Sequence, residues 1–290
     1  MAGGGRSSPP GAAAAGGGAA VGGGAAVDGD AAVGGDSATL LKRIVRDGVR
    51  DLVAIEEPLE IRVAGEPLAV TMRTPGHDEE LALGFLYGEG LIAGPVPVGL
   101  TADLAANTIE VDAELLRSPS SRRFYTTSSC GVCGKGALAE VAVHAPAPPA
   151  GPPSPVLARA LLAGLPERLV QPGFARSGGL HATGLFDAAG EPLCVREDVG
   201  RHNAMDKVIG WALRQRLTPL AALVLCVSGR LSFELVQKAT VAGAPILVGV
   251  GAPTSLAVAL AVERGMTLCG FARRGAMNVY SGGERVTAAE

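Results

Sequence analysis

Residues 222–275 carry the clearest pattern in the chain and read ALVLCVSGR, LSFELVQKATVAG, A, PILVGVGAP, TSLAVALAVERG, M and TLCGFARRG. Short runs that are almost wholly apolar (ALVLCV, PILVGV and TLCGF) alternate with longer segments whose composition suits helices. Strands without polar alternation are typical of a mainly parallel sheet that is covered on both faces. We therefore predict an α/β layered domain in this half of the chain.

The segments before this stretch extend the same domain. HATGLFD (181–187) and EPLCVRE (191–197) flank an Ala-Ala-Gly turn and predict a β-hairpin. Residues 199–217 have the spacing of an amphipathic helix. Its apolar side is expected to consist of Met205, Val208, Ile209 and Leu213.

The N-terminal half has a different pattern. VRDLVAI (49–55), LEIRVAG (59–65) and EPLAVTM (66–72) alternate apolar and polar positions, as strands of a half-buried antiparallel sheet do. A helix is predicted from near His77 to Gly88, because three acidic residues fill its first turn and leucines line one side.

Composition divides the chain into three parts. Residues 1–38 contain 13 Gly and 12 Ala and predict a disordered tail. Residues 39–120 form a small β-rich N-terminal subdomain with one helix, completed by short strands near Leu100 and Ile109. Residues 121–290 form the α/β domain, which contains a Cys-x-x-Cys loop and a surface loop at 145–156 with six prolines in twelve positions.

The overall composition excludes several classes of partner. With 48% hydrophobic residues the chain has ample material for a core, and a formal net charge of -3 gives no field that attracts nucleic acid. Neither a signal peptide nor a long apolar run is found, so we expect a cytoplasmic protein with no membrane and no nucleic-acid partner.

The segment TTSSCGVCGKG (126–136) carries the most reactive chemistry. Cys130 and Cys133 are close to Lys135, and a nearby cation favours the thiolate form of cysteine. The surrounding glycines favour a mobile loop, which suits a sulfur that moves between donor and acceptor. A purely structural turn is the alternative. Three further cysteines lie in apolar runs and are predicted to be small buried hydrophobes: Cys194, Cys226 and Cys269.

A zinc site is a competing interpretation of the same cysteines. Two cysteines supply half of a closed zinc site. His77-Asp78-Glu79 is an H-x-E, and H-x-E with C-x-x-C is the outline of a zinc nucleobase deaminase, using His77, Glu79, Cys130 and Cys133. Ser129 stands where that outline has proline, and His77 also fits a helix start, so deamination is the second hypothesis. A thioredoxin-like exchanger places its motif in a compact βαβ unit that this chain lacks at this point.

The C-terminal strands end in loops that suit an anion. Ser228-Gly229-Arg230 follows one predicted strand, and Gly249 and Gly251 lie at the end of the next. Backbone N–H groups and helix dipoles at such loops can bind a nucleotide-like ligand, although glycine there is also common packing chemistry. Arg273 and Arg274 add positive charge after the last predicted strand.

Polar residues also crowd into EDVGRHNAMD at a predicted helix start. A capped helix with a surface ion pair is the favoured interpretation, although Arg201 can pair with a carboxylate and His202 can titrate near neutral pH. His181, in SGGLHATG, has two interpretations: a hydrogen-bonded residue of the hairpin or a residue that lines a pocket. The polar members of the helix-start cluster are Glu197, Asp198, Arg201, His202, Asn203 and Asp206.

Six ordered blocks give the chain a family resemblance: TPGHDEELALGFLYGEGLI, SSCGVCGKG, SGGLHATGLF, REDVGRHNAMDKVIGWAL, VSGRLSFELVQKA and GVGAPTSLAVALA. From about Val53 to about Tyr280 the chain resembles the FdhD/NarQ family of formate dehydrogenase accessory sulfurtransferases. The resemblance implies a fold similar to cytidine deaminases, a homodimer and no metal ion of its own.

The resemblance also implies an activity and a site. Sulfur is taken from a cysteine desulfurase as a persulfide on Cys130, assisted by Cys133. It is passed to the molybdenum cofactor, as bis-molybdopterin guanine dinucleotide, before that cofactor enters formate dehydrogenase. The cofactor-binding segment is implied to be Phe271, Ala272, Arg273, Arg274, Gly275 and Ala276.

Overall fold

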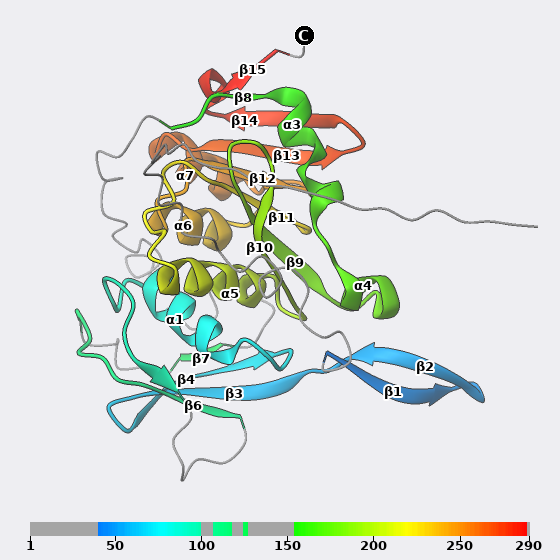
Figure 1. Cartoon of the computed structure of the whole chain (residues 1–290), viewed down its shortest axis with the longest axis vertical. Helices are drawn as coiled ribbons and strands as arrows, with labels where there is room; N and C mark the ends of the chain where they lie inside the picture. The colour runs from blue at the N-terminus through cyan, green and yellow to red at the C-terminus, as the bar shows by residue number, and fades with distance from the viewer. Residues whose placement is uncertain (1–39, 100–106, 118–123, 127–153, 289–290) are drawn as a thin grey trace, which may run out of the picture.

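The computed structural model describes residues 40–99, 107–117, 124–126 and 154–288, which form a mixed α/β structure around two main sheets (Figure 1). The predicted Gly/Ala tail, the Cys-x-x-Cys loop and most of the proline-rich loop lie outside the described residues. In the described part of the chain, no helix has the length and apolar character needed to cross a membrane.

The central sheet confirms the layered α/β prediction for the C-terminal half. Its strand order is β10-β9-β11-β12-β13-β14. Strands β11, β12 and β13 are parallel, whereas β10, β9 and β14 join the sheet through antiparallel pairing. The predicted hairpin is the β9–β10 pair. The strand bounds are β9 (His181–Phe186), β10 (Pro192–Asp198), β11 (Val224–Val227), β12 (Ile246–Gly249), β13 (Thr267–Arg273) and β14 (Ala276–Ser281).

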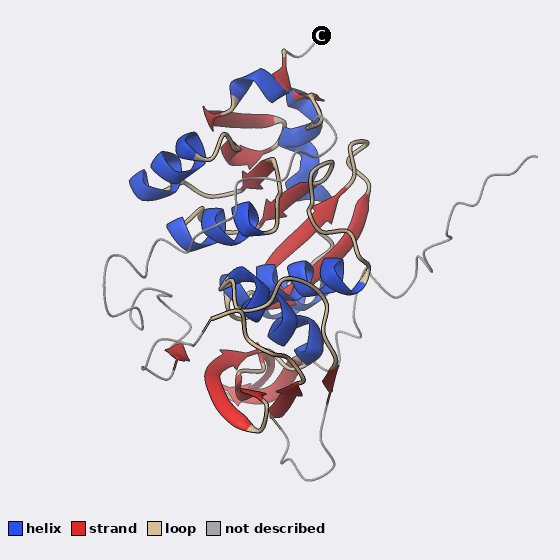
Figure 2. Ribbon diagram, turned by 90° about the vertical axis from the view of Figure 1, so that its left-hand side faces the viewer, coloured by secondary structure: helices blue, strands red, loops and turns tan. Residues whose placement is uncertain are grey.

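Helices cover both faces of this sheet, as the apolar strands required (Figure 2). One face packs against α5 (Arg201–Arg214), α6 (Phe233–Val241) and α7 (Ser255–Glu263). The other packs against α3 (Arg159–Gly164) and the 3-10 turn η1 (Leu165–Arg168). The four residues predicted for the apolar side of α5 are all fully buried. The remaining elements here are β8 (Leu157–Ala158), α4 (Pro172–Ser177), η2 (Gly283–Arg285) and β15 (Val286–Thr287), with β8 and β15 paired in parallel.

A second sheet lies below α1 and α5 in Figure 1 and has the order β5-β6-β3-β4-β7. Its hairpin β3–β4 turns at Gly65, as predicted. Helix α1 (Asp78–Gly88) also forms as predicted and lies between this sheet and α5. The strands are β3 (Glu57–Val63), β4 (Glu66–Arg73), β5 (Val98–Gly99), β6 (Thr108–Val111) and β7 (Phe124–Thr126).

The segment VRDLVAI forms a strand but does not join the antiparallel sheet for which it was predicted. It is β2 (Val49–Ala54), and it pairs with β1 (Leu41–Arg46) in a separate hairpin that extends from the body (Figure 1). The reason is that both edges of β3 are occupied, by β4 on one side and by β6 on the other. Helix α4 contacts β2 instead.

Helices α1 and α5 cross with their backbones in contact. A Cβ added to Gly84 would lie 1.8 Å from the carbonyl oxygen of Asp206, and one added to Gly210 would lie 1.8 Å from that of Glu80. Each glycine therefore makes room for the backbone of the other helix. This crossing joins the N-terminal sheet to the layered domain and sets the position of α5, whose first residues belong to the site described next.

Candidate functional site

The two cysteines of the Cys-x-x-Cys motif, Cys130 and Cys133, lie outside the described residues. The other three cysteines are free and buried, as predicted. Burial raises the pKa of Cys194 and of Cys269 to about 12, and it raises the pKa of Cys226 as well. These three thiols are therefore protonated at neutral pH and poor nucleophiles.

The loops at the carboxyl ends of β11, β12 and β13 form one hydrogen-bonded edge. The N–H of Gly251 donates to the carbonyl oxygen of Gly229 at 2.9 Å, and the N–H of Phe271 donates to the carbonyl oxygen of Gly251 at 3.1 Å. Carboxyl ends of neighbouring parallel strands are a common place for ligands in α/β proteins. The structure thus brings together the three loops in which the sequence placed an anion site.

Several of the predicted residues at this edge have packing roles. A Cβ on Gly249 would lie 2.7 Å from Cγ of Leu231, and a Cβ on Gly251 would lie 2.9 Å from the carbonyl oxygen of Gly229. The Ser228 hydroxyl oxygen accepts a hydrogen bond from the N–H of Ala182 at 2.8 Å. Close approach of neighbouring loops therefore explains why small residues occupy these positions.

The segment from Phe271 to Ala276 covers the end of β13, the turn and the start of β14. The register shifts between Gly270 and Arg273, and Phe271 has a φ of 54° with 42% of its surface exposed. Ala272 is fully buried, whereas Arg273, Arg274 and Gly275 are exposed in the turn beyond the edge. The N–H of Arg274 donates to Glu167 at 2.7 Å. Phe271 is thus next to Gly251, and the two arginines lie further along the hairpin.

Two residues from other elements lie beside Gly229, and neither was predicted to belong to this edge. A Cβ on Gly229 would lie 3.4 Å from Nδ1 of His181, the first residue of β9, and 4.0 Å from Cδ of Arg201, the first residue of α5. Both side chains are half-buried. Only tertiary packing brings them together, because about 20 to 50 residues separate these positions in the chain.

His202 connects the start of α5 to the start of α6. Its Nε2 lies 3.3 Å from the Ser232 hydroxyl oxygen and 3.7 Å from Oε2 of Glu234. Burial lowers the pKa of His202, and the neighbouring His202 imidazole lowers the pKa of Glu234 to about 2. Glu234 is therefore ionised at neutral pH and lies beside the imidazole.

Charge repulsion acts on His181. Its pKa is lowered by burial and then by Arg201, His202 and Arg230, with Asp198 opposing the shift. His181 is consequently neutral at pH 7 in the ligand-free protein. Arg201 and Arg230 thus add to the effect of burial in keeping His181 uncharged.

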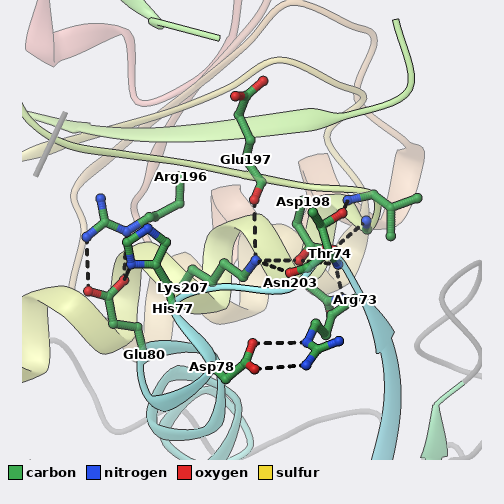
Figure 3. A network of polar contacts seen from close by, with 12 residues as sticks. Arg73, Thr74, His77, Asp78, Glu80, Arg196, Glu197, Asp198, Asn203 and Lys207 are labelled. Carbon is green, nitrogen blue, oxygen red and sulfur yellow. Dashed lines mark hydrogen bonds and ion pairs between the residues drawn. The ribbon is translucent and has the colours of Figure 1, made fainter. Parts of the chain in front are cut away.

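A buried polar network holds the start of α5 in place (Figure 3). Oδ2 of Asp198 lies 2.7 Å from Nζ of Lys207, and both side chains are fully buried. Oδ1 of Asp198 accepts hydrogen bonds from the N–H of Gly200 and from Nδ2 of Asn203, while Thr74 donates its N–H to Oδ2. The predicted surface ion pair is wrong here, because the N-terminal sheet and α1 cover this helix start.

Two further ion pairs flank that network. Arg73 pairs with Asp78 through two hydrogen bonds of 3.0 and 2.9 Å. Arg196 pairs with Glu80 in the same way, at 2.7 and 2.9 Å. The first pair joins β4 to α1, and the second joins α1 to β10 of the layered domain.

His77 and Glu79, the proposed deaminase residues, have separate partners. Nδ1 of His77 lies 3.5 Å from Oε2 of Glu80, whereas Glu79 pairs with Arg214 at 2.8 Å on the surface. Burial, followed by Arg196, lowers the pKa of His77 to about 4. Among the described residues, no group of three His, Cys, Asp or Glu side chains is arranged to hold a metal ion.

Comparison with known proteins gives a consistent result. A family model described as the FdhD/NarQ family matches residues 54–287. The "Sulfur carrier protein FdhD" of Mycobacterium tuberculosis is 49% identical over 256 residues, which covers 82% of this chain and 92% of that protein. The protein of the same name from Nocardia farcinica is 52% identical over 251 residues, covering 82% and 88%.

A solved structure has a similar fold. It is the crystal structure of a protein from Desulfotalea psychrophila that is provisionally named a formate dehydrogenase accessory protein. Its sequence is 26% identical to this chain, and the TM-score between the two structures is 0.68. The match covers 85% of this chain and 98% of that one. The similarity in fold therefore extends over most of this chain.

Proposed function

This chain belongs to the FdhD/NarQ family, and we propose on that basis that it is a sulfur carrier required for formate dehydrogenase activity. In this proposal a cysteine desulfurase supplies sulfur, which Cys130 carries as a persulfide with help from Cys133. The acceptor is the bis-molybdopterin guanine dinucleotide cofactor, before its insertion into formate dehydrogenase. The family resemblance adds a cytoplasmic location, a homodimer and a core related to cytidine deaminases.

The observation that carries the proposal is the assignment of the cysteines. The relatives are named sulfur carriers, and a carrier needs an accessible thiolate. Three of the five cysteines are buried with raised pKa values. Cys130 and Cys133 are therefore the candidate carriers, since glycines and Lys135 accompany them in the sequence.

Loading is a thiol exchange. The Cys130 thiolate attacks the outer sulfur of the donor persulfide, so a bond forms between Sγ and that sulfur while the donor S–S bond breaks. The donor cysteine leaves as a thiolate, and Cys130 becomes the persulfide. No net oxidation occurs, because one persulfide is exchanged for another.

Release uses the second cysteine. The Cys133 thiolate attacks Sγ of Cys130, which forms a disulfide between the two residues and expels the outer sulfur as hydrosulfide toward the acceptor. A dithiol reductant then restores both thiols. The arginines of the strand-end loops support the nucleotide part of this proposal, because guanidinium groups suit phosphate. Within the described part of the chain, no contact of His77 or Glu79 favours the deaminase alternative.

Complementation tests this function. A bacterial strain that lacks its own sulfur carrier should regain formate dehydrogenase activity with the wild-type chain and with Ser129→Ala, a control within the same motif that leaves both thiols. Cys130→Ala should give no activity above the deletion strain, at equal protein level. Full activity of Cys130→Ala would remove this residue from the proposed transfer.

A further inference from the structure

We propose that Thr71 and Asn203 are positioning residues for sulfur delivery, because they fix the end of β7, from which the chain continues to Cys130, against the start of α5. The inference rests on the proposed function for the role of Cys130. It assigns a task in that function to the N-terminal sheet, which sets the point where the chain that leads to the carrier cysteine begins.

Strand β7 is the last described element before Cys130 (Figure 1). It pairs with β4 in parallel, and Thr126 at its end is the register partner of Thr71. Parallel strands run toward the same end of a sheet, so the chain leaves β7 beside the carboxyl end of β4. An antiparallel pairing would have placed this point toward the turn at Gly65, which lies before the other end of β4.

Asn203 bonds the carboxyl end of β4 to the first turn of α5. Its Nδ2 donates to the carbonyl oxygen of Met72 at 2.7 Å, and its Oδ1 accepts a hydrogen bond from the Thr71 hydroxyl at 3.2 Å. The same Nδ2 donates to Oδ1 of Asp198 at 3.0 Å (Figure 3). One side chain therefore joins β4, β10 and α5.

These contacts are shielded from water. Thr71 is 6% exposed and Asn203 is 8% exposed. Removing one partner of a buried hydrogen bond leaves the other partner unsatisfied, so the bond holds the two elements in one arrangement. Asn203 is held in turn, because its partner Asp198 is paired with Lys207 at 2.7 Å.

Sequence spacing limits how far Cys130 can lie from this junction. Cys130 follows Thr126 by four positions, and four residues span at most about 14 Å. The first turn of α5 also contains Arg201, which lies beside Gly229 at the strand-end loops. A shift of β4 relative to α5 would therefore move the origin of the carrier and leave those loops in place.

Two partial reactions test the inference. Loading is the fraction of Cys130 that gains one sulfur from a cysteine desulfurase and cysteine, measured by intact mass. Delivery is the rate at which formate dehydrogenase activity appears after induction, in a strain that lacks its own sulfur carrier and at equal protein level. The variants are Thr71→Val, Thr71→Ser and Asn203→Ala.

The matched control is Thr267→Val. Thr267 is also a buried threonine, and its hydroxyl donates to the carbonyl oxygen of Gly282 at 2.7 Å. It lies on β13, which pairs with β12 and β14 rather than with the N-terminal sheet. Its loss tests what the removal of one buried hydroxyl does in general. Circular dichroism and thermal melting compare the folding of all variants.

We expect Thr71→Val and Asn203→Ala to load within about twofold of wild type but to deliver sulfur about tenfold more slowly, because delivery depends on where the carrier is held. Loading is less sensitive, since the donor is a separate protein that approaches from solution. Thr71→Ser keeps the hydroxyl and should recover most of the delivery rate. Thr267→Val should resemble wild type in both reactions.

Several results would overturn the inference. Normal delivery by the folded Thr71→Val and Asn203→Ala proteins excludes it, and so does an equal loss of loading and delivery, which indicates general damage. A loss of delivery as large in Thr267→Val excludes it as well. If Thr71→Val fails to fold, Asn203→Ala gives the answer. Failure of the proposed function is recognised separately, because wild type then gains no sulfur on Cys130, and that result removes the inference with it.

Discussion

Substitution of Gly210 by alanine should separate the two helices that join the halves of the molecule. The added Cβ would lie 1.8 Å from the carbonyl oxygen of Glu80, whereas ordinary contacts begin at 3.4 Å. The backbones must therefore move apart by about 1.6 Å, which is the difference between these distances. Neither atom belongs to a flexible side chain, so no rotamer change can relieve the overlap.

The expected loss of stability is about 2–4 kcal/mol. Overpacking a core costs about 1–3 kcal/mol, and a clash between backbones exceeds that range at roughly 3–5 kcal/mol. Alanine has a better helix propensity than glycine, and this offsets about 1 kcal/mol of the loss in stability. The side chains packed around this crossing include Leu81, Phe85 and Ile209, which would lose contacts as α1 and α5 separate.

Urea unfolding followed by circular dichroism measures this difference. The matched control is Gly164→Ala at the end of α3, where no atom lies within 4 Å of the added Cβ and stability should change by about 1 kcal/mol or less. Gly84→Ala in combination with Gly210→Ala should be less destabilising than the sum, because the helices are already apart. A Gly210→Ala protein as stable as wild type would refute the backbone contact.

Two other predictions concern the buried interface. Lys207→Met should lower the free energy of unfolding by about 3–5 kcal/mol, because it leaves the buried Asp198 carboxylate without its cation, and adding Asp198→Asn should recover part of this loss in urea unfolding. An unchanged midpoint for Lys207→Met would contradict the pair. His77 has a folded-state pKa of about 4 against an ordinary 6.5, so the unfolded state takes up the proton first and stability falls as pH is lowered from 6.5 to 4. Both proteins are unfolded in urea at each pH. Between pH 6.5 and pH 4 the free energy of unfolding of His77→Asn should fall by about 1–3 kcal/mol less than that of wild type, and parallel curves would disprove the assignment.

Local sequence patterns were sufficient for most of the layered domain. Apolar runs predicted β11, β12 and β13, and periodicity predicted α1 and α5, because the hydrophobic spacing of these segments is set within a few residues. Pairing was harder to predict. The strand at Val49–Ala54 was expected beside LEIRVAG, but the edges of β3 are taken by strands that lie later in the chain.

The site was predicted only in part for a similar reason. Glycines at strand ends identified the loops around Gly229 and Gly251, since such loops have a local signature. His181 and Arg201 reach the same edge only after β9 and α5 have packed, and nothing near them in the sequence indicates this. The cluster around Asp198 resembled a solvated helix start, because its burial depends on an N-terminal sheet more than a hundred residues away.

Mass spectrometry of the intact protein determines whether Cys130 carries the sulfur. The chain is incubated with a cysteine desulfurase and cysteine, and the masses of wild type, Cys130→Ala and Cys133→Ala are compared before and after treatment with a reductant. We predict that wild type gains one sulfur atom that the reductant removes, and that Cys130→Ala gains none. Absence of the added sulfur from wild type, or its presence in Cys130→Ala, would exclude Cys130 as the sulfur carrier.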